Sequence, residues 1–209
     1  MEVTAERSDR LKRAAANRQI DLTVILENVH DPHNIGAVLR SCDAVGISEV
    51  YILNTDPRIT AENLIAGKSS SSGARKWVKT HYFEDMNECL KRVRLKYNSI
   101  WASNLDSISS EPIHEINLAK SIALAFGNEH DGISKELLES SDGTFHVPMK
   151  GLIQSLNISV ACAVTLYESL RQRQLAGKYS NNYNPNDKIQ NAFYQDFIKI
   201  HFKEKYKLK

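Results

Sequence analysis

Residues 145–174 read FHVPMKGLIQSLNISVACAVTLYESLRQRQ, and this stretch decides the predicted fold. Its first part, Phe145 to Pro148, predicts a short strand that ends at the proline, which has no N–H to donate to a neighbouring strand. Lys150 to Asn157 is a polar turn with a glycine, which lets the backbone approach a ligand closely. Ile158 to Gln174 predicts a helix that is apolar nearly all round in its first half, so we expect that half to be buried in a core.

The turn before this helix has two interpretations. Gln154, Ser155 and Asn157 precede the predicted helix, where free backbone N–H groups and the positive end of the helix dipole favour a ligand. Alternatively, Ser155 or Asn157 is only the N-cap of the helix. The stretch alone does not distinguish a binding site from a cap.

The composition is ordinary for a globular protein, with 209 residues, 42% of them hydrophobic and 25% charged, enough for one α/β domain with appended segments. The net charge of +2 is too small to indicate a nucleic-acid partner by itself. Cys42, Cys89 and Cys162 lack metal-type spacing and suit a reducing compartment. There is no membrane-length apolar run and no signal peptide, so we expect a soluble, cytoplasmic protein.

Strands and helices alternate along the middle of the chain. Unbroken apolar runs predict buried strands at Leu22–Leu26, Glu49–Leu53 and Ile122–Phe126, with shorter strands at Val78–Thr80 and Ser99–Ala102. Periodicity and caps predict helices at 3–18 (capped by Thr4), 35–45 (capped by Asn34), 60–65, from Asp85, from Ser134 and at 187–206. This alternation predicts an α/β fold with a parallel-rich sheet covered by helices on both faces.

Three polar turns follow predicted strands, at Glu27–Asn34, Gly127–Gly132 and Lys150–Asn157. Ligands of open α/β sheets bind at the carboxyl ends of strands, so we expect a site where these turns meet. The absence of GxGxxG and GxxxxGK[ST] argues against a Rossmann dehydrogenase and a P-loop NTPase. Arg40 lies in the otherwise apolar segment AVLRSCDAV, where it is either a surface residue or the partner of an anion such as a phosphate.

The run His30-Asp31-Pro32-His33 contains groups that bind metals. Pro32 breaks the helical spacing of the two histidines, and no third ligand is evident in the sequence. We therefore expect no metal site.

Three segments together resemble the three ordered motifs of the SpoU (SPOUT) RNA 2′-O-methyltransferases: NVHDPHNIGAVLRSCDAVGISEVYIL, ALAFGNEHDGIS and HVPMKGLIQSLNISVACAVTLYESLRQRQ. The resemblance implies a catalytic domain at 21–177 with a deep trefoil knot in roughly 122–177, a basic helical extension at 1–20 and a Lys-rich helical extension at 178–209. It also implies S-adenosyl-L-methionine as cofactor, and a homodimer formed largely through the first and last helices of the catalytic core, which completes the site.

The resemblance carries roles onto the matching residues of this chain. The implied catalytic residues are Asn34, Arg40, Glu129, Ser155 and Asn157. The implied cofactor-binding residues are Phe126, Gly127, Asn128, Val147, Met149, Ser155 and Leu156. A ribose 2′-hydroxyl is a poor nucleophile, and an arginine at its ordinary pKa is a poor base. Arg40 is therefore assigned more readily to phosphate positioning than to activation of the hydroxyl, and methyl transfer from this cofactor needs no metal.

Within the family, the resemblance points to members that methylate guanosine 18 in the D-loop of tRNA. The alternatives are a 2′-O-methyltransferase acting on ribosomal RNA or another tRNA position, and a non-catalytic RNA-binding protein on the same fold. Basic residues in both extensions and in the loop after the second strand are expected to bind RNA phosphates, which makes binding weaken with salt. These residues are Arg7, Arg10, Lys12, Arg13, Arg18, Lys68, Arg75, Lys199 and Lys203.

Overall fold

Seven strands form one sheet in this computed structural model, which describes residues 3–57, 73–105, 109–180 and 182–207. All neighbouring strands pair in parallel, in the order β3-β2-β1-β6-β4-β7-β5. The strands are β1 (Leu22–Glu27), β2 (Glu49–Leu53), β3 (Lys79–Phe83), β4 (Ser99–Ser103), β5 (Glu111–Pro112), β6 (Ile122–Phe126) and β7 (Gly143–His146). The predicted α/β fold with a parallel-rich sheet is confirmed.

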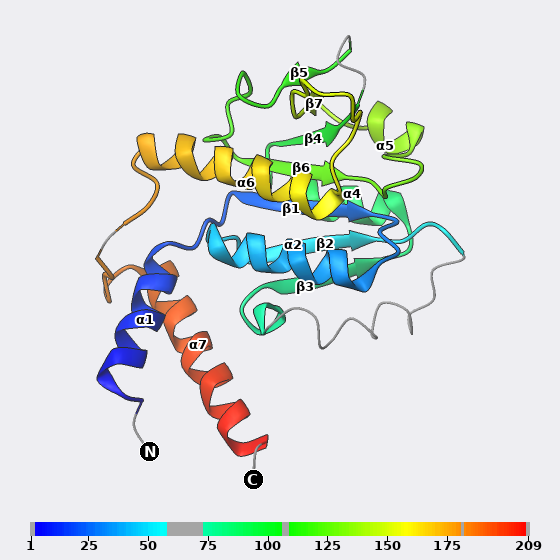
Figure 1. Cartoon of the computed structure of the whole chain (residues 1–209). Helices are drawn as coiled ribbons and strands as arrows, with labels where there is room; N and C mark the ends of the chain where they lie inside the picture. Colours follow the sequence, from blue (N-terminus) through cyan, green and yellow to red (C-terminus); the bar gives the residue numbers. More distant parts are fainter. Residues whose placement is uncertain (1–2, 58–72, 106–108, 181, 208–209) are drawn as a thin grey trace.

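Helices cover both faces of the sheet (Figure 1). Helices α2 and α6 lie on one face, while α4 and α5 lie on the other, and α1 and α7 pack together beside the sheet. Their bounds are α1 (Ala5–Ala16), α2 (Pro32–Ala44), α4 (Met86–Arg94), α5 (Lys135–Glu139), α6 (Ile158–Leu175) and α7 (Lys188–Lys207), with a 3-10 turn η2 (Ala74–Lys76). None of the helices in the described ranges is long and apolar enough to cross a membrane. The predicted helix at 60–65 lies outside these ranges.

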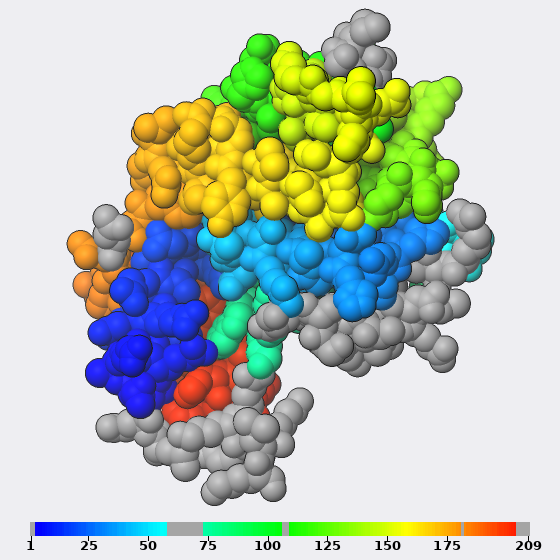
Figure 2. All heavy atoms as spheres, in the orientation of Figure 1, coloured from blue at the N-terminus to red at the C-terminus, as the bar shows by residue number. Residues whose placement is uncertain are grey.

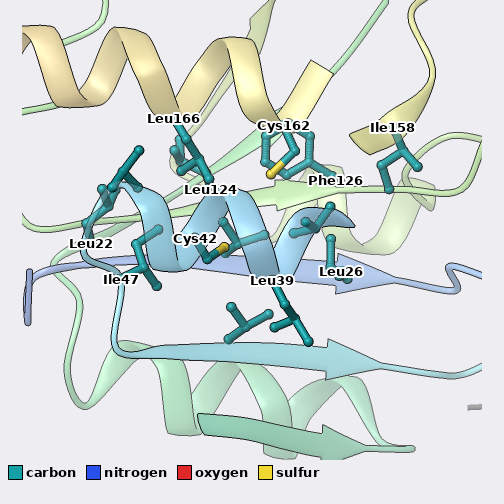
Figure 3. Close-up of a cluster of buried hydrophobic side chains, with 14 of the residues drawn as sticks. Leu22, Leu26, Leu39, Cys42, Ile47, Leu124, Phe126, Ile158, Cys162 and Leu166 are labelled. Atoms are coloured by element: carbon teal, nitrogen blue, oxygen red, sulfur yellow. The ribbon is translucent and has the colours of Figure 1, made fainter. Parts of the chain in front are cut away.

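The larger core lies between the sheet and the helices α2 and α6 (Figure 3). Leu39 and Cys42 of α2 belong to this core together with Cys162 and Leu166 of α6. Burial raises the pKa of the Cys42 thiol well above its ordinary value, as it does for Cys162. Both thiols are therefore held neutral and act as small apolar groups in the packing.

Predicted helix caps are partly confirmed. Thr4, Asp85 and Ser134 are the N-caps of α1, α4 and α5, as predicted. The prediction that Asn34 caps its helix is wrong, because α2 begins two residues earlier at Pro32. The N-cap is Asp31, whose carboxylate accepts the His33 N–H at 2.8 Å. A proline fits the first helical turn, where its missing N–H has no intrahelical partner to lose.

Helix α6 differs from its prediction in burial. Its first half lies on the face of the sheet beside α2, but Val160 and Val164 are 46% and 42% exposed, and Tyr167 is 55% exposed. These three residues follow the i, i+4, i+7 spacing of one helix face. The expected burial all round is therefore wrong, and α6 presents an apolar face that no described element covers. The strand β7 also ends earlier than predicted, at His146 rather than at Pro148.

The two terminal helices form a small core of their own. Leu11 and Ala15 of α1 pack against Phe197 of α7. The ring of Trp77, which follows η2, meets Phe197 edge-on with 5.5 Å between centroids. The guanidinium carbon of Arg18 lies 5.0 Å from the centre of the buried Phe197 ring, a cation–π contact of a kind that contributes about 2 kcal/mol when the groups are withdrawn from water. Residues from both ends of the chain thus form one unit.

Arg173 joins α6 to two strands near its C-terminal end. Its side chain is fully buried, and its Nε donates to the Leu118 carbonyl at 2.9 Å. Its Nη1 donates to Gln19 Oε1 at 3.0 Å and to Asp21 Oδ1 at 2.6 Å. Its Nη2 donates to the carbonyls of Asp21 and Lys120 at 3.1 and 2.7 Å. All five N–H donors of the guanidinium are therefore used.

The pKa of Asp21, the carboxylate that pairs with Arg173, is shifted by these contacts. Burial alone would raise the pKa of Asp21, but hydrogen bonds from Lys178 and Arg173 outweigh it and lower that pKa below its ordinary value. Asp21 precedes β1, and Lys120 precedes β6, so Arg173 connects α6 to the starts of two adjacent central strands.

A second buried carboxylate lies at the start of β2, at the amino-terminal edge of the sheet. Glu49 Oε1 accepts hydrogen bonds from Lys96, Tyr97 and Tyr51 at 2.7, 2.9 and 3.0 Å. Its Oε2 lies 3.1 Å from His81 Nε2. Burial would raise the pKa of Glu49, but the hydrogen bonds from Lys96 and Tyr97 lower it to about 2.

Replacing Arg173 by methionine is expected to lower the free energy of unfolding by about 3–5 kcal/mol, because it removes the five hydrogen bonds that the guanidinium donates in a buried position and breaks the ion pair with Asp21. The matched control is Arg171→Met on the same helix, whose side chain is 58% exposed and pairs with Glu168. That exposed pair contributes about 0–1 kcal/mol. Urea denaturation measures both variants, and equal losses would refute the role of Arg173.

Candidate active site

A pocket of about 460 Å³ opens at the carboxyl ends of β4, β6 and β7. Three segments line it: the end of β4 with the residues after it, the loop after β6, and the segment from β7 into α6. Its apolar wall includes Phe126 and Phe145, whose rings meet edge-on at 5.7 Å between centroids. Asn128, Glu129 and Asn157 supply polar groups. The pocket lies where open parallel sheets bind their ligands, and its volume is in the range of small-molecule sites.

The loop after β6 forms one wall of the pocket and is held by its own backbone. A Cβ on Gly127 would come within 1.9 Å of the Gly132 carbonyl oxygen, so only glycine fits there. The Asn128 side-chain oxygen accepts the N–H groups of His130 and Asp131 at 2.8 and 2.7 Å. Gly132 has a φ of +69° and donates its N–H to the Asn128 carbonyl at 3.1 Å. The loop is therefore a compact turn of defined shape.

Asn34 hydrogen-bonds to two other predicted site residues, Glu129 and Asn157. The Asn34 amide on α2 donates to Glu129 Oε1, and its oxygen accepts a hydrogen bond from Asn157 Nδ2 at 3.2 Å. Asn157 also caps α6, since its side-chain oxygen accepts the Ser159 N–H at 2.9 Å. The interpretation of Asn157 as an N-cap is confirmed, and the same side chain also contacts the polar cluster, while its role toward a ligand stays a prediction.

The structure brings most predicted site residues together. All seven predicted cofactor-binding residues line the pocket. Of the five predicted catalytic residues, Glu129, Ser155 and Asn157 line it as well, and Asn34 contacts two of these. Arg40 is exposed on α2 and is not among the described residues that line the pocket. Of the two interpretations of Arg40, the position on the surface is confirmed, and its pairing with an anion such as a phosphate stays a prediction.

Sequence reasoning missed a third wall of the pocket. Ser103, Asn104 and Leu105 lie at and just beyond the end of β4 and line the pocket. His146 was also missed, whereas Gln154, named with the turn before the helix, does line the pocket. Because β4 is next to β6 in the sheet, the rule that ligands bind at strand ends would have identified the first three residues once the strand order was known.

The predicted RNA-binding residues fall into distinct environments. Arg10, Arg13, Lys199 and Lys203 are exposed on α1 and α7. Arg7, Lys12 and Arg75 are partly buried, and Lys68 lies outside the described ranges. The Arg18 side chain is only 3% exposed, because it pairs with Asp43 at 2.6 Å and donates to the Ile47 carbonyl. We therefore withdraw Arg18 from the RNA-binding set.

The two histidines considered as metal ligands do not form such a site. His30 Nε2 lies 3.5 Å from Asp56 Oδ2, while His33 is exposed at the start of α2. Within the described part of the chain, no group of three or more His, Cys, Asp or Glu side chains is placed to hold a metal ion.

The second and third motifs line this pocket at the carboxyl ends of a parallel sheet, and the first motif reaches it through Asn34, as expected for the SpoU class of RNA-modifying enzymes. Residues 21–167 match the SpoU rRNA Methylase family, and the chain belongs to this family. The chain is 39% identical over 178 residues to the tRNA (guanosine(18)-2'-O)-methyltransferase of Thermus thermophilus, covering 85% of this chain and 89% of that protein.

Solved structures give the same assignment of fold. The crystal structure of the A. aeolicus TrmH/SpoU tRNA modifying enzyme superposes with a TM-score of 0.76 at 31% identity, covering 93% of this chain and 96% of that one. The SpoU methyltransferase AviRb from Streptomyces viridochromogenes, crystallised in complex with the cofactor AdoMet, superposes with a TM-score of 0.67 at 22% identity, over 77% of this chain and 61% of that one. At that identity, the second similarity shows the fold alone.

Gly127→Ala is expected to destabilise the protein by about 1–3 kcal/mol and to open the loop after β6, because the added Cβ overlaps the backbone of Gly132. Gly151→Ala is the matched control, since a Cβ there has no neighbouring atom within 4 Å. Urea denaturation and amide hydrogen exchange of residues 128–132 measure the effect. Unchanged exchange in the Gly127 variant would contradict the packing described for this loop.

Proposed function

We propose that this chain is an S-adenosyl-L-methionine-dependent methyltransferase that modifies the ribose 2′-hydroxyl of guanosine 18 in tRNA. The observation that carries the proposal is the polar cluster of Asn34, Glu129 and Asn157, which joins the first motif to a pocket lined by the second and third. The Thermus thermophilus relative, whose name states this activity, is similar over 85% of the chain. Family membership and this extent of similarity favour the same reaction here.

The pocket suits S-adenosyl-L-methionine in size and chemistry. The aromatic and aliphatic wall of Phe126, Phe145 and Ile158 fits a flat base, and polar groups of Asn128 and Glu129 fit a charged amino-acid portion. Gly127 brings two backbone segments into close approach, which leaves backbone N–H and C=O groups at the pocket surface. When bound, the cofactor supplies an electrophilic methyl group on a sulfonium.

The side chains of the site would act on the ribose. A 2′-hydroxyl loses its proton with difficulty, so it must be oriented and its developing negative charge stabilised. The Asn34 and Asn157 amides hold Glu129 and one another in fixed orientations, and Ser155 lies exposed at the same rim. Arg40, as a permanent cation, would position the RNA phosphate and stabilise the developing alkoxide.

A homodimer would bring Arg40 to this site. Arg40 does not line the pocket of its own chain, and α2, which carries it, lies beside α6 on one open face of the molecule (Figure 2). Val160, Val164 and Tyr167 form the exposed apolar face of α6 on that side. We propose that two copies pair through α2 and α6, as a symmetric dimer whose contact uses the same patch on each copy.

The α1–α7 unit is the proposed RNA-binding extension. Residues 1–20 and 178–209, expected as separate extensions of a domain at 21–177, pack against each other through Leu11, Ala15 and Phe197. Their exposed cations Arg10, Arg13, Lys199 and Lys203 would bind RNA phosphates, with Arg7, Lys12 and Arg75 at the margin. Three buried free cysteines favour a reducing compartment, and we propose that the protein acts in the cytoplasm.

The trefoil knot in roughly 122–177 remains a proposal. Strand β7 lies between β4 and β5, both of which precede it in the chain. Phe145 accepts the Asn104 N–H at 2.8 Å, and His146 accepts the Ile113 N–H at 2.9 Å. To form a knot, the chain after β6 must pass through a loop made by an earlier part of the chain. The position of β7 between β4 and β5, followed by α6, supports such a passage. Tracing the chain in an experimental electron-density map tests the knot directly.

The purified protein with S-adenosyl-L-methionine labelled on its methyl group is expected to methylate unmodified tRNA transcripts at guanosine 18. Arg40→Ala should lower kcat by about a hundredfold or more, since it removes the charge that faces the reacting oxygen. Arg92→Ala, an exposed arginine on α4 across the sheet, is the matched control and should keep full activity. Labelling of ribosomal RNA but of no tRNA would refute the proposed substrate, and no labelling of either would favour a non-catalytic RNA-binding protein.

Mixing two inactive variants tests the dimer. If each site takes Arg40 from one copy and Glu129 from the other, then Arg40→Ala and Glu129→Ala subunits should complement each other. Half of the dimers formed after denaturing and refolding an equal mixture are mixed, and each mixed dimer holds one intact site, so about a quarter of wild-type activity should return. Absence of recovery in a mixture shown to contain mixed dimers would place both residues in one chain's site.

A further inference from the structure

Glu27 is a buried carboxylate that the proposed reaction does not use. It is the last residue of β1 and is only 1% exposed. Its Oε2 accepts the Ser134 N–H at 2.8 Å, and its Oε1 accepts the Ser134 hydroxyl at 2.6 Å. Among the described residues, Ser134 supplies all the hydrogen bonds that reach this carboxylate. Such a group is costly to bury, so its presence at the end of an otherwise apolar strand requires an explanation.

Ser134 closes the loop that forms one wall of the pocket. It follows Gly127–Ile133 directly and is the N-cap of α5, where its hydroxyl oxygen accepts the Leu137 N–H at 3.2 Å. Because the same hydroxyl donates its hydrogen to Glu27, its orientation is determined from both sides. The carboxylate thus fixes both the backbone and the side chain of Ser134.

The loop is held at two points by a single segment of the chain. Glu27 at the end of β1 holds Ser134, and Asn34 in the first turn of α2 holds Glu129. Between these points the loop is stiff, because Gly127 packs against Gly132 and the Asn128 side chain closes the turn. A displacement at Ser134 is therefore transmitted to Glu129 and to the pocket wall rather than absorbed within the loop.

We propose that Glu27 is a positioning residue for the cofactor pocket. It is not among the described residues that line the pocket, and it acts through Ser134 on the loop that does. This inference rests on the proposed function in one respect, namely that the ligand of the pocket is S-adenosyl-L-methionine. Preorganising the loop before the ligand arrives strengthens binding, because the bound state does not then have to order it.

The test uses Glu27→Gln in the full-length protein. Glutamine offers one acceptor oxygen and an NH₂ group, whereas Ser134 presents two donors, so one of the two hydrogen bonds is lost or the α5 cap is given up. Glu49→Gln is the matched control: Glu49 is also a strand-end carboxylate that is 9% exposed, but it lies at the opposite edge of the sheet. Both variants should be less stable to urea.

Only the Glu27 variant should lose affinity for the pocket's ligand. Calorimetric titration with S-adenosylhomocysteine at a temperature where both variants are folded should show about tenfold weaker binding for Glu27→Gln, and a change below about twofold for Glu49→Gln. Ser134→Ala should weaken binding similarly, and the double variant Glu27→Gln/Ser134→Ala should be little worse than either single change. Affinity within twofold of wild type for Glu27→Gln would refute the positioning role.

A second measurement separates this inference from the proposed function. Hydrogen exchange of amides 129–133 in the ligand-free protein should accelerate by about tenfold in Glu27→Gln and stay unchanged in Glu49→Gln. If wild-type protein does not bind S-adenosylhomocysteine, the cofactor assignment fails while this exchange result still decides the role of Glu27. Unchanged exchange at these amides would overturn the inference whatever the ligand is.

Discussion

The buried guanidinium of Arg173 determines where helix α6 lies. It connects the C-terminal end of this helix to the residues before β1 and before β6, with every donor used. The N-terminal end lies about 22 Å away along the helix axis, at a rise of 1.5 Å per residue. There Asn157, which lines the pocket, donates a hydrogen bond to Asn34. Because α6 is held at both ends, the geometry of the site depends on an ion pair far from it.

The local pattern of the chain predicted its elements well, and long-range contacts account for the differences. Strands β1, β2 and β6 are buried at every position and mostly apolar, because helices cover both faces of the sheet. The exposed face of α6 could not be read from its apolar pattern, since a helix that meets a partner protein and a helix buried in a core show the same pattern. The start of α2 differs from its prediction because Asp31, which precedes a proline, caps this helix in place of Asn34.

The site shows the same division between local and long-range information. Turns after apolar strands located two walls of the pocket, whereas the wall at Ser103–Leu105 required the strand order, which no local pattern contains. Glu27 was assigned to a loop because a carboxylate ends an apolar run, although it belongs to the buried strand. Arg18 looked like a surface cation in a basic helix, and only the fold reveals Asp43 beside it. Ion pairs between residues far apart in the sequence cannot be predicted from the spacing of residue types.

The packing of α1 against α7 has a consequence for synthesis on the ribosome. Helix α1 emerges first, but the side chains that cover Leu11 and Ala15 belong to a helix that begins at Lys188. At usual translation speeds, the interval is on the order of ten seconds. During that time the apolar face of α1 is open to chaperones and to other nascent chains. A messenger RNA truncated before codon 188 would yield a chain that lacks α7. The apolar face of α1 would then stay exposed, and cellular quality control removes chains of this kind.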